Sequence, residues 1–442
     1  MQRSVALVRS GSVLALTYSN LERVRVAAGN VVVEVESATI CEADRRVVSG
    51  SKRIEGMPHC TTLGHEAVGR VVAVGKDVKG IKKGDFVAIM PHQVPEAERA
   101  KEAFRRGEIF KLHTQHAGMH VCGTIANHVE WPAEWVRVLP RKTIAKAKLA
   151  AQTHGLHWSL PLAEIEHLAC VMTSVEYFEH GDQIWAESRN VRAMQSGAGN
   201  MLLVGAGWMS HLYHLHWKRR FPLAKVAIKD VDESRLRMFQ DLSEATMGVR
   251  PEVVHGLDKS AESKFDVVVM ATAARPAALD LFRFVKSGGH VILFSGIHNG
   301  ATDLVFDPTK LSDLERIHRD GICAPVFRTP LADHRDMVVA SGTSGYQVSN
   351  FDRATREIAD YAPGIGAGIT GVVLGMESAQ LLSVKSGASP LLDAHGMPVL
   401  PTLFAPRWPG QEGHLKVGIH PLATPELALH YTRMASRKGG GA

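Results

Sequence analysis

The sequence lacks long apolar runs and is poor in cysteine, and each absence limits what the chain can be. No stretch approaches the ~18 consecutive apolar residues of a membrane-spanning helix, and residues 1–4 do not lead into the apolar core of a signal peptide. We therefore expect a cytoplasmic protein with no membrane partner. The five cysteines are an odd number spread along 442 residues, which excludes a disulfide framework and indicates reduced thiols.

An excess of charge of one sign and a high aromatic content are also missing. The chain has 51 Lys and Arg against 45 Asp and Glu, a net charge of +6, and 6% aromatic residues. Its basic residues are scattered and not gathered into a stripe with interleaved aromatics, so we expect a small-molecule substrate and no nucleic acid. At 45% hydrophobic residues, the composition is that of an ordinary globular protein with about two to three domains.

The richest set of chemically active residues lies between residues 40 and 87. Cys41, His65 and Glu66 supply a thiolate, an imidazole and a carboxylate, which are ligand types that zinc accepts. Glycine allows positive φ and close backbone approach, so the glycines around these residues favour a small, tightly turning β barrel. They stand at positions 64, 69, 75 and 84.

A second informative stretch begins at residue 200. An apolar run over residues 200–204 leads into glycines and a helical pattern, and a second apolar run over residues 225–229 ends in Asp230. This order is typical of a dinucleotide-binding βαβ unit. The turn between strand and helix contains Gly205, Ala206, Gly207, Trp208 and Met209.

These residue types suit a bound dinucleotide. Gly205 allows the tight turn, Gly207 lets backbone amides approach a pyrophosphate, and the helix N-terminus adds partial positive charge. Asp230 is expected to accept hydrogen bonds from the adenosine ribose and to repel a 2′-phosphate, which favours NAD over NADP. Lys225 and Lys229 are close enough in sequence to oppose that preference.

The rest of this region predicts a parallel sheet covered on both faces. Continuous apolar runs over residues 265–272, 287–296 and 338–346 alternate with helical patterns over 277–285 and 351–361. Runs of this kind are typical of strands buried on both sides.

Together these segments resemble the zinc-dependent medium-chain dehydrogenase/reductase family, which includes alcohol and polyol dehydrogenases. The resemblance is carried by Cys41 with Asp44, by the motif Gly64–Gly69 and by Val74–Gly75. It implies an α/β fold in which a GroES-like β-barrel catalytic domain is joined to a Rossmann domain with a doubly wound parallel sheet. The implied cofactors are Zn²⁺ and NAD.

The resemblance also implies a domain order. Residues 1–175 are expected to form the N-terminal part of the catalytic domain, residues 176–350 the Rossmann domain, and residues 351–442 the return to the catalytic domain. Two segments, 307–336 and 384–409, are longer than simple members of the family need. A homo-oligomer, either a dimer or a tetramer, is expected by analogy.

By this resemblance, Cys41, His65 and Glu166 are the protein ligands of a catalytic zinc with one open position. Glu66 approaches the zinc from behind or exchanges with it, and Asp44 orients the His65 imidazole. These five side chains are the predicted catalytic and metal-binding set.

The third ligand has rivals in the sequence. Glu166 stands where polyol-type members usually have the glutamate of Glu-Pro-Leu, but His167 replaces the proline. Glu164, His167 and Cys170 therefore stay open as alternatives, and a helix-capping or surface carboxylate is the competing interpretation of Glu166.

The resemblance extends to the cofactor side. In the family, the ends of the cofactor-domain strands line the nicotinamide half of the site, which assigns Ala271, Thr272 and Ser295 to the cofactor site. The glycine turn and Asp230 serve the pyrophosphate and the adenosine ribose.

The chain departs from the family where the alcohol proton is handled. Relatives commonly place Ser or Thr two residues after the ligand cysteine and often His three residues further on, whereas this chain has Ala43 and Arg46. The usual relay cannot operate unaltered. A water with Glu66 carries the proton, or another side chain such as His59 does, or turnover is slow or absent.

The resulting prediction is a zinc-dependent enzyme that interconverts a secondary alcohol and a ketone with NAD(H), acting on a polyol, sugar or cyclitol. Arg45, Arg46, Lys52 and Arg53 form a solvated basic face or attract a phosphorylated substrate. The alternatives are a metal-independent reductase of the same fold and a non-catalytic dinucleotide-binding protein, which the lost relay favours.

A second zinc site is not expected. Family members often carry a lobe in which four cysteines bind a structural zinc, and this chain has only Cys122 there. His113, His116, His120 and Cys122 are a conceivable substitute, although histidine-rich surface loops are common.

Overall fold

The structure is a computed structural model, and its described residues form two compact units. The first unit contains the described residues up to 93, from 115 to 166 and from 351 onward, and the second contains those from 167 to 350. No helix in the described part of the chain is long and apolar enough to cross a membrane. The described residues are 2–10, 13–21, 26–48, 60–93, 115–255, 261–295, 317–318, 323–327, 337–343, 345–374, 380–383 and 416–421.

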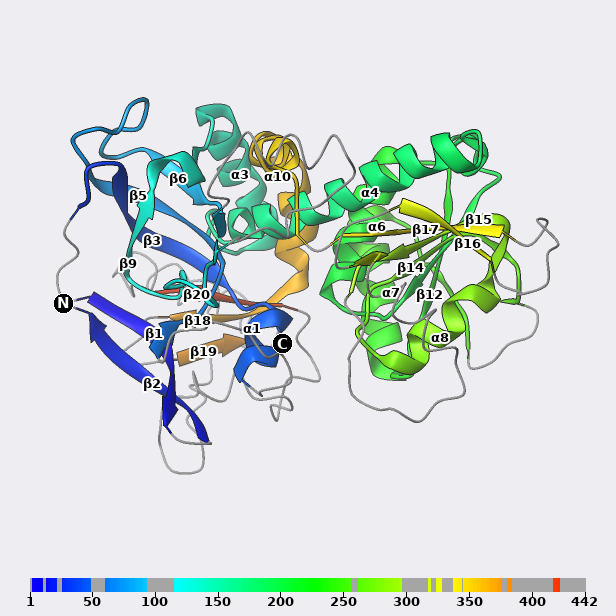
Figure 1. Cartoon of the computed structure of the whole chain (residues 1–442), viewed down its shortest axis with the longest axis horizontal. Helices are drawn as coiled ribbons and strands as arrows, with labels where there is room; N and C mark the ends of the chain where they lie inside the picture. The colour runs from blue at the N-terminus through cyan, green and yellow to red at the C-terminus, as the bar shows by residue number, and fades with distance from the viewer. Residues whose placement is uncertain are drawn as a thin grey trace, which may run out of the picture. The chain divides into compact units, whose positions relative to one another are not determined.

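The first unit is built on a long, mostly antiparallel sheet (Figure 1). Its strand order is β10-β6-β5-β3-β20-β18-β19, with β9 also paired to β3, and smaller sheets β2-β1-β4 and β7-β8 accompany it. The described part of the chain opens in strands and later adds β18, β19 and β20 to this sheet. The bounds are β1 Gln2–Ser10, β2 Val13–Leu21, β3 Asn30–Thr39, β4 Cys60–Thr62, β5 Glu66–Val74, β6 Phe86–Ile89, β7 His92–Gln93, β8 Gln115–His116, β9 His128–Pro132, β10 Val136–Val138, β18 Ile369–Leu374, β19 Gln380–Ser383 and β20 Lys416–His420.

Strand β3 is the centre of this sheet. It pairs with β5, β9 and β20, and its four valines are buried while Glu34 and Glu36 are partly exposed. The register with β5 shifts between Val32 and Val33 and again between Val35 and Ser37. Such irregularities increase the local twist, which suits a sheet that curls.

Short helices connect these strands, and one prediction about them was too short. The predicted helix over residues 351–361 is α10, which runs from Val348 to Gly368 and continues through Pro363. Proline removes one backbone hydrogen bond, but Ala362 and Ile365 beside it are fully buried, and their packing holds the helix together. The other helices of this unit are α1 Glu42–Val48, η1 Ala133–Trp135, α3 Arg141–His154 and η2 Pro161–Glu164.

The second unit contains the predicted parallel sheet. Its strand order is β13-β12-β11-β14-β15-β17-β16, and every pairing is parallel except that of β16 with β17. Strand β16 lies within the segment 307–336 that the sequence marks as an insertion, and it forms the antiparallel edge. The bounds are β11 Asn200–Val204, β12 Lys225–Lys229, β13 Glu252–Val253, β14 Phe265–Met270, β15 Val285–Leu293, β16 Cys323–Phe327 and β17 Met337–Gly342.

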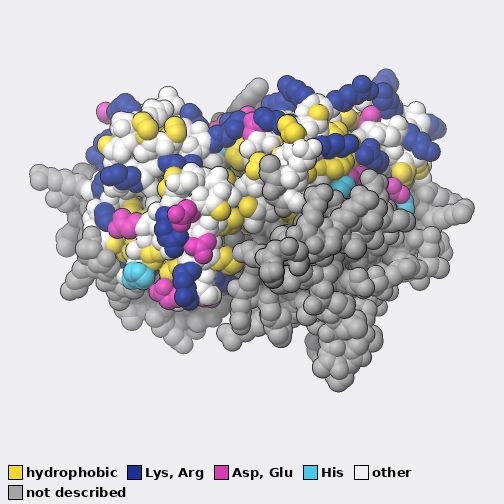
Figure 2. Space-filling model, turned by 180° about the vertical axis from the view of Figure 1, so that it is seen from behind, with side chains coloured by type: hydrophobic (Ala, Val, Ile, Leu, Met, Phe, Trp, Pro, Cys, Tyr) yellow, Lys and Arg dark blue, Asp and Glu magenta, His cyan; other side chains and the backbone are white. Residues whose placement is uncertain are grey.

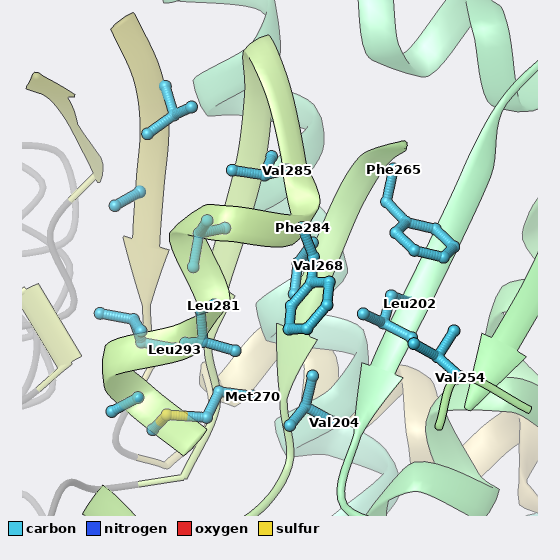
Figure 3. Packing of buried hydrophobic residues seen from close by; sticks show 14 of the residues in the cluster. Leu202, Val204, Val254, Phe265, Val268, Met270, Leu281, Phe284, Val285 and Leu293 are labelled. Carbon is cyan, nitrogen blue, oxygen red and sulfur yellow. The ribbon is translucent and has the colours of Figure 1, made fainter. Parts of the chain in front are cut away.

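Helices cover both faces of the parallel sheet. On one face, Leu281 and Phe284 of α8 pack on alternate residues of the strands, among them Leu202, Val268 and Met270 (Figure 3). On the other face, α4 contacts α6 through Ser174 and Tyr213, and α6 contacts α7. The bounds are α4 Ile165–Trp185, α5 Arg189–Ser196, α6 Trp208–Arg220, α7 Glu233–Met247 and α8 Arg275–Phe284.

Charged side chains of both signs share the surface. Arg250 contacts Asp241 and Glu244 at 2.9 and 2.8 Å, and Lys264 contacts Glu252 at 3.1 Å. On the face drawn in Figure 2, Lys and Arg side chains lie among acidic and apolar ones. Exposed pairs of this kind contribute little stability individually, so the second unit depends mainly on its core.

Two buried histidines make the second unit sensitive to acid. His214 of α6 shares a 3.1 Å hydrogen bond with Ser243 and stacks on Phe239, and burial, aided by His211 and Lys218, lowers its pKa to about 3. His290 of β15 shares a 2.8 Å hydrogen bond with Ser341, and burial lowers its pKa to about 3. Both imidazoles are therefore neutral in the folded protein at neutral pH.

We predict that the stability of this unit falls between pH 6.5 and pH 4. An unfolded histidine has a pKa of about 6.5, so in this window the unfolded chain binds more protons than the folded chain, and each histidine costs roughly 1.4 kcal/mol per pH unit. Amide hydrogen exchange of α6 and α7 measures the loss of protection. His214→Phe should reduce its pH dependence, while replacing the exposed His255 by Gln should not; equal slopes for both variants would contradict the prediction.

Candidate functional site

The pairing of β3 brings the predicted metal ligands together. Thr39 of β3 lies opposite Glu66 of β5 in the antiparallel register. Cys41 follows β3 by two residues and His65 immediately precedes β5, so both emerge at the same end of this strand pair. Antiparallel register alone therefore places the thiol and the imidazole side by side, although 23 positions separate them in the sequence.

Asp44 holds together the metal corner, which is the end of the β3–β5 pair where Cys41 and His65 lie. Its Oδ1 accepts a hydrogen bond from the Gly64 backbone N–H at 3.2 Å and lies 3.2 Å from His65 Nδ1, while its Oδ2 accepts from the Cys41 N–H at 3.2 Å. Gly64 has φ +92°, and a Cβ there would meet Ile125 at 2.4 Å, so only glycine fits. The expected contact between Asp44 and His65 is present, and it leaves His65 Nε2 as the nitrogen for a metal.

Electrostatics at His65 follow from the same contacts. Burial disfavours the charged imidazole, but the Asp44 carboxylate and the Cys41 sulfur outweigh burial, and the pKa of His65 lies well above its ordinary value. A metal ion that binds Nε2 must therefore displace a proton.

The donor set fits a zinc ion. Ligand atoms of His65, Glu66 and Glu166 lie within 4.8 Å of one another, and the Cys41 sulfur lies within the same distance of a Glu66 carboxylate oxygen. Tetrahedral zinc with bonds of about 2.0–2.3 Å separates its ligand atoms by roughly 3.3–3.8 Å, which lies within this limit. All three members of the first group are buried, and thiolate, imidazole and carboxylate are donors that zinc accepts.

Glu66 is anchored by residues that the sequence did not single out. Its Oε2 accepts hydrogen bonds from Thr39 Oγ1 at 2.5 Å and from Lys416 Nζ at 2.8 Å, while its Oε1 lies 3.5 Å from His65 Nε2. Lys416 Nζ also lies 3.4 Å from Glu164 Oε1. Burial opposes the charge on Lys416, but Glu164, Glu66 and Cys41 raise its pKa well above its ordinary value.

These contacts bear on the alternatives for the third ligand. Glu164 is an ion-pair partner of Lys416, and Glu166 lies in the group with His65 and Glu66. His167 and Cys170 are both buried in helix α4, within the second unit. Within the first unit, the geometry favours Glu166 over Glu164.

Ala43 and Arg46 occupy the two positions where relatives carry the hydroxyl and the imidazole of the proton relay. Ala43 donates its backbone N–H to the Cys41 sulfur at 3.4 Å, and the half-buried Arg46 has its pKa lowered by burial, with Glu42 and Cys41 acting in the opposite direction. Arg45 is 3.5 Å from Glu42, whereas Lys52, Arg53 and His59 lie outside the described residues. Neither Ala43 nor Arg46 replaces a hydroxyl–imidazole path.

One histidine near the metal corner was missed as a neighbour of His65. The His116 ring packs edge-on against His65 with ring centroids 5.0 Å apart. His120 accepts the His116 backbone N–H at 3.2 Å through Nδ1, and Cys122 is exposed. His113 lies outside the described residues, so the structure describes only three members of the conceivable second metal set.

In the second unit, the glycine turn has the predicted conformation. Gly205 has φ +104°, and a Cβ there would lie 2.9 Å from Thr272 Cβ, which requires glycine. Gly207 precedes α6 and faces open space, as an approach by a phosphate needs. Ser210, which stands where the third small residue is usual, is buried and donates its hydroxyl to the Gly205 carbonyl.

The carboxyl edge of the parallel sheet carries the other predicted cofactor residues. Asp230 Oδ2 accepts the Ala206 N–H at 2.6 Å and so fixes the glycine turn. Ala271 and Ser295 donate their N–H groups to Val204 and Met270 carbonyls, at 2.9 and 3.0 Å, which aligns the ends of neighbouring strands. Trp208 and Met209 begin helix α6 beside this edge, and Trp208 is buried.

Lys225 and Lys229 differ in how far they can oppose the preference for NAD over NADP that Asp230 favours. Lys225 begins β12 and lies opposite Asn200, at the amino edge of the sheet, so five residues of extended strand, roughly 16 Å, separate it from Asp230. Lys229 Nζ lies 5.4 Å from the centre of the Phe284 ring. The carboxylate is therefore the charge that dominates the ribose position.

Known families match each unit in part. Residues 27–141 match the alcohol dehydrogenase GroES-like domain, and residues 193–316 match the ornithine cyclodeaminase/mu-crystallin family. The first match contains Cys41, Asp44, His65 and Glu66, and the second contains the glycine turn and Asp230. Each covers less than half of the chain.

Individual proteins extend the comparison. An alcohol dehydrogenase of Geobacillus stearothermophilus is 32% identical over 28% of this chain and 37% of its own length. A D-altritol 5-dehydrogenase of Agrobacterium fabrum is 28% identical over 60% of this chain and 69% of its own length. The Haloferax mediterranei glucose dehydrogenase, solved with NADP, Zn and gluconolactone, superposes with a TM-score of 0.61 at 16% identity, covering 95% of this chain and 99% of that one.

The Asp44 contacts predict a test at the metal corner. Asp44→Asn keeps an acceptor for Gly64 but loses the charge that orients the His65 imidazole, so zinc affinity should fall by about 10- to 100-fold. Competition with a chromophoric chelator measures the affinity. The exposed Asp77 provides a matched control, since Asp77→Asn removes the same charge elsewhere in the unit; equal losses for the two variants would show that Asp44 has no specific role.

The architecture of both units, the motif around His65 and these similarities agree with one another. The curled sheet with the Cys41 and His65 corner matches a GroES-like domain, and the parallel sheet with the Gly205 turn is of the Rossmann type. Solved dehydrogenases share this arrangement of elements over nearly the whole chain. Residues 27–141 therefore resemble an alcohol dehydrogenase GroES-like domain, and the chain as a whole has the fold of solved zinc-binding dehydrogenases.

Proposed function

We propose that the chain is a zinc-dependent dehydrogenase that interconverts a secondary alcohol and a ketone with NAD(H). The observation that carries the proposal is that His65, Glu66 and Glu166 lie together in one unit with the Cys41 sulfur close to Glu66, while Asp44 contacts the far nitrogen of the imidazole. A sulfur, a nitrogen and carboxylate oxygens at this spacing suit a zinc site, because buried charged groups are costly in a core that binds no ion.

The roles of the residues follow from their contacts. Cys41, His65 and Glu166 would hold the ion, and a bound zinc supplies Lewis acidity to the oxygen of the reacting carbinol or carbonyl. Asp44 fixes the ring of His65, so that Nε2 faces the Glu66 side of the site. The Cys41 backbone is held by the same carboxylate, which keeps thiol and imidazole in a fixed relation before any ligand arrives.

The cofactor side supports NAD. Asp230 directly follows β12 and holds the glycine turn through Ala206, so its charge is fixed where the second strand of a Rossmann unit meets the adenosine ribose. A fixed carboxylate at this position disfavours a 2′-phosphate. The NADP in the Haloferax glucose dehydrogenase therefore does not transfer to this chain.

The substrate class is proposed to be a polyol, sugar or cyclitol, free or phosphorylated. The similarity to D-altritol 5-dehydrogenase over 60% of the chain supports a polyhydroxylated substrate. Arg46, half-buried and interacting with Cys41, places a positive charge near the metal corner, which suits an anionic substituent. Since Ala43 and Arg46 leave no family-type relay, we expect slower proton exchange than in relatives with a hydroxyl at position 43.

We predict that the zinc-loaded protein reduces NAD⁺ with at least one secondary alcohol among polyols, sugars and cyclitols, free and phosphorylated. Cys41→Ser or removal of zinc by a chelator should lower kcat/KM by at least about 100-fold, because the Lewis acid is lost. Absorbance of NADH and metal analysis of the same samples provide the measurement.

Further variants define the outcome. Cys122→Ser is the matched control, since that thiol is exposed. Glu166→Gln should lose zinc, whereas Glu164→Gln should retain it. A protein without stoichiometric zinc that still turns over would indicate the metal-independent reductase, and tight NAD binding without turnover of any substrate would indicate the non-catalytic protein.

The position of Asp230 predicts the cofactor preference. Asp230→Ala should weaken NAD⁺ binding by about 10-fold or more, because it removes a charged acceptor for the ribose, and it should narrow the preference over NADP⁺. Fluorescence titration of both cofactors gives the two dissociation constants. Glu233→Gln removes an exposed charge three positions away as a control; an unchanged ratio of the constants in Asp230→Ala would refute the assignment.

A further inference from the structure

One face of the first unit gathers cationic side chains from two segments of the chain. The turn between β5 and β6 carries four exposed lysines, and helix α3 carries four exposed cations. In Figure 2, Lys and Arg side chains are crowded along the upper right edge of the surface, with few acidic ones among them. We call these residues the basic face: Lys76, Lys79, Lys82, Lys83, Arg141, Lys142, Lys146 and Lys148.

Strand pairing joins the two segments. Val138 of β10 lies opposite Val87 of β6, so α3 begins beside the end of the turn that leads into β6. Further along α3, the Lys148 ammonium lies 4.9 Å from the centre of the Trp158 ring, and that ring packs on Phe86 with centroids 4.8 Å apart. The basic residues look scattered in the sequence because the two segments are far apart there, and the fold brings them together.

Most of these charges lack the acidic partners that other surface cations have. Among the residues that the structure describes, Lys146 is the one member of the basic face with an ion pair, which it forms with Asp360. By contrast, Arg250 of the second unit contacts two carboxylates. Helix α3 contains no acidic residue, and the turn contains only Asp77 and Asp85. The basic face therefore has an uncompensated positive charge that attracts anions.

The composition of the basic face favours a lipid surface over a nucleic acid. Seven of its eight cations are lysines, whose ammonium is a point charge without the planar fork by which arginine recognises phosphates. Stacking on bases uses aromatic side chains, and neither α3 nor the turn contains Phe, Tyr or Trp.

An exposed apolar side chain lies among the cations of α3. Leu149 is 64% exposed and shares one stripe of the helix with Lys142 and Lys146, at spacings of four and three residues, while Thr143 and Ala147 are buried on the other side. A leucine among lysines can enter the headgroup region of a bilayer while the long lysine side chains reach the lipid phosphates.

We propose that the basic face docks the first unit on the surface of a bilayer that contains anionic phospholipids. Its ammonium groups lie at the level of the lipid phosphates, and Leu149 enters the boundary between headgroups and acyl chains. Each lysine near such a surface contributes about a fivefold change in binding, so the affinity is a sum of many small terms. The interaction is peripheral and independent of the proposed dehydrogenase activity, because neither the metal corner nor Asp230 takes part.

Sedimentation of the full chain with vesicles tests the proposal. The chain should bind vesicles of phosphatidylcholine with about one third phosphatidylglycerol and not those of phosphatidylcholine alone, because only the first have a negative surface potential. Salt at about 0.5 M should release it, since the Debye length falls to roughly 4 Å. Binding should weaken by about 100-fold or more in the combined variant Lys76→Gln, Lys79→Gln, Lys82→Gln and Lys83→Gln.

A matched variant separates this face from net charge. The second unit loses four exposed charges in the combined variant Arg192→Gln, Arg219→Gln, Lys225→Gln and Arg237→Gln, which should retain most of the binding. Equal losses in the two combined variants, or no binding of the wild-type chain to anionic vesicles, would overturn the proposal. Binding to duplex DNA or RNA without binding to these vesicles would overturn it in favour of a nucleic acid.

The leucine distinguishes a lipid surface from other anions. Leu149→Gln should weaken vesicle binding by about 5- to 10-fold, because an apolar side chain no longer leaves water. Leu223 of the second unit is 62% exposed, and Leu223→Gln should leave binding unchanged. Unchanged binding in Leu149→Gln would overturn the assignment to lipid, since charge alone would then account for the attraction.

Discussion

The register of strand β3 is the constraint on which the first unit depends. Thr39 lies opposite Glu66 on one neighbouring strand and opposite Gly418 on the other. Because the strand ends are aligned in this way, a thiol, an imidazole, a carboxylate and an ammonium from three segments of the chain meet at one corner. A shift of β5 by one residue would turn Glu66 to the opposite face of the sheet, and the same shift of β20 would turn Lys416 away.

The buried charged groups at that corner have partners of opposite sign before any metal arrives. Asp44 faces His65, and Lys416 faces Glu66 and Glu164, so every one of these charged groups has an opposite partner within 3.5 Å. Leaving any of them alone in the interior would cost several kcal/mol. The arrangement therefore permits a folded protein without zinc, and a bound ion would enter a site whose side chains are already oriented.

In the second unit, a few backbone and side-chain contacts organise the carboxyl edge of the parallel sheet. A parallel sheet ends all its strands at one edge, and the backbone groups there connect Val204, Met270 and their neighbours in a row. Asp230 adds a fixed negative charge to the glycine turn. The N-terminus of α6, Gly207 with open space at its Cβ position, and the Asp230 carboxylate then lie together at the edge where a dinucleotide binds in folds of this kind.

The sequence by itself determined the features that depend on local residue type. Apolar runs, glycines of positive φ such as Gly64 and Gly205, and the order of Cys41, His65 and Asp230 predicted both sheets and most of the candidate site, because strand periodicity and turn chemistry act over a few residues. The length of α10 and the strand β16 were not predicted, since packing around Pro363 and along a sheet edge overrides local signals. Only the tertiary structure decided that Lys416 meets Glu66, 350 positions earlier, and that His116 packs on His65. Such contacts follow from strand pairing between distant segments, and a linear pattern carries no record of which distant segments will pair.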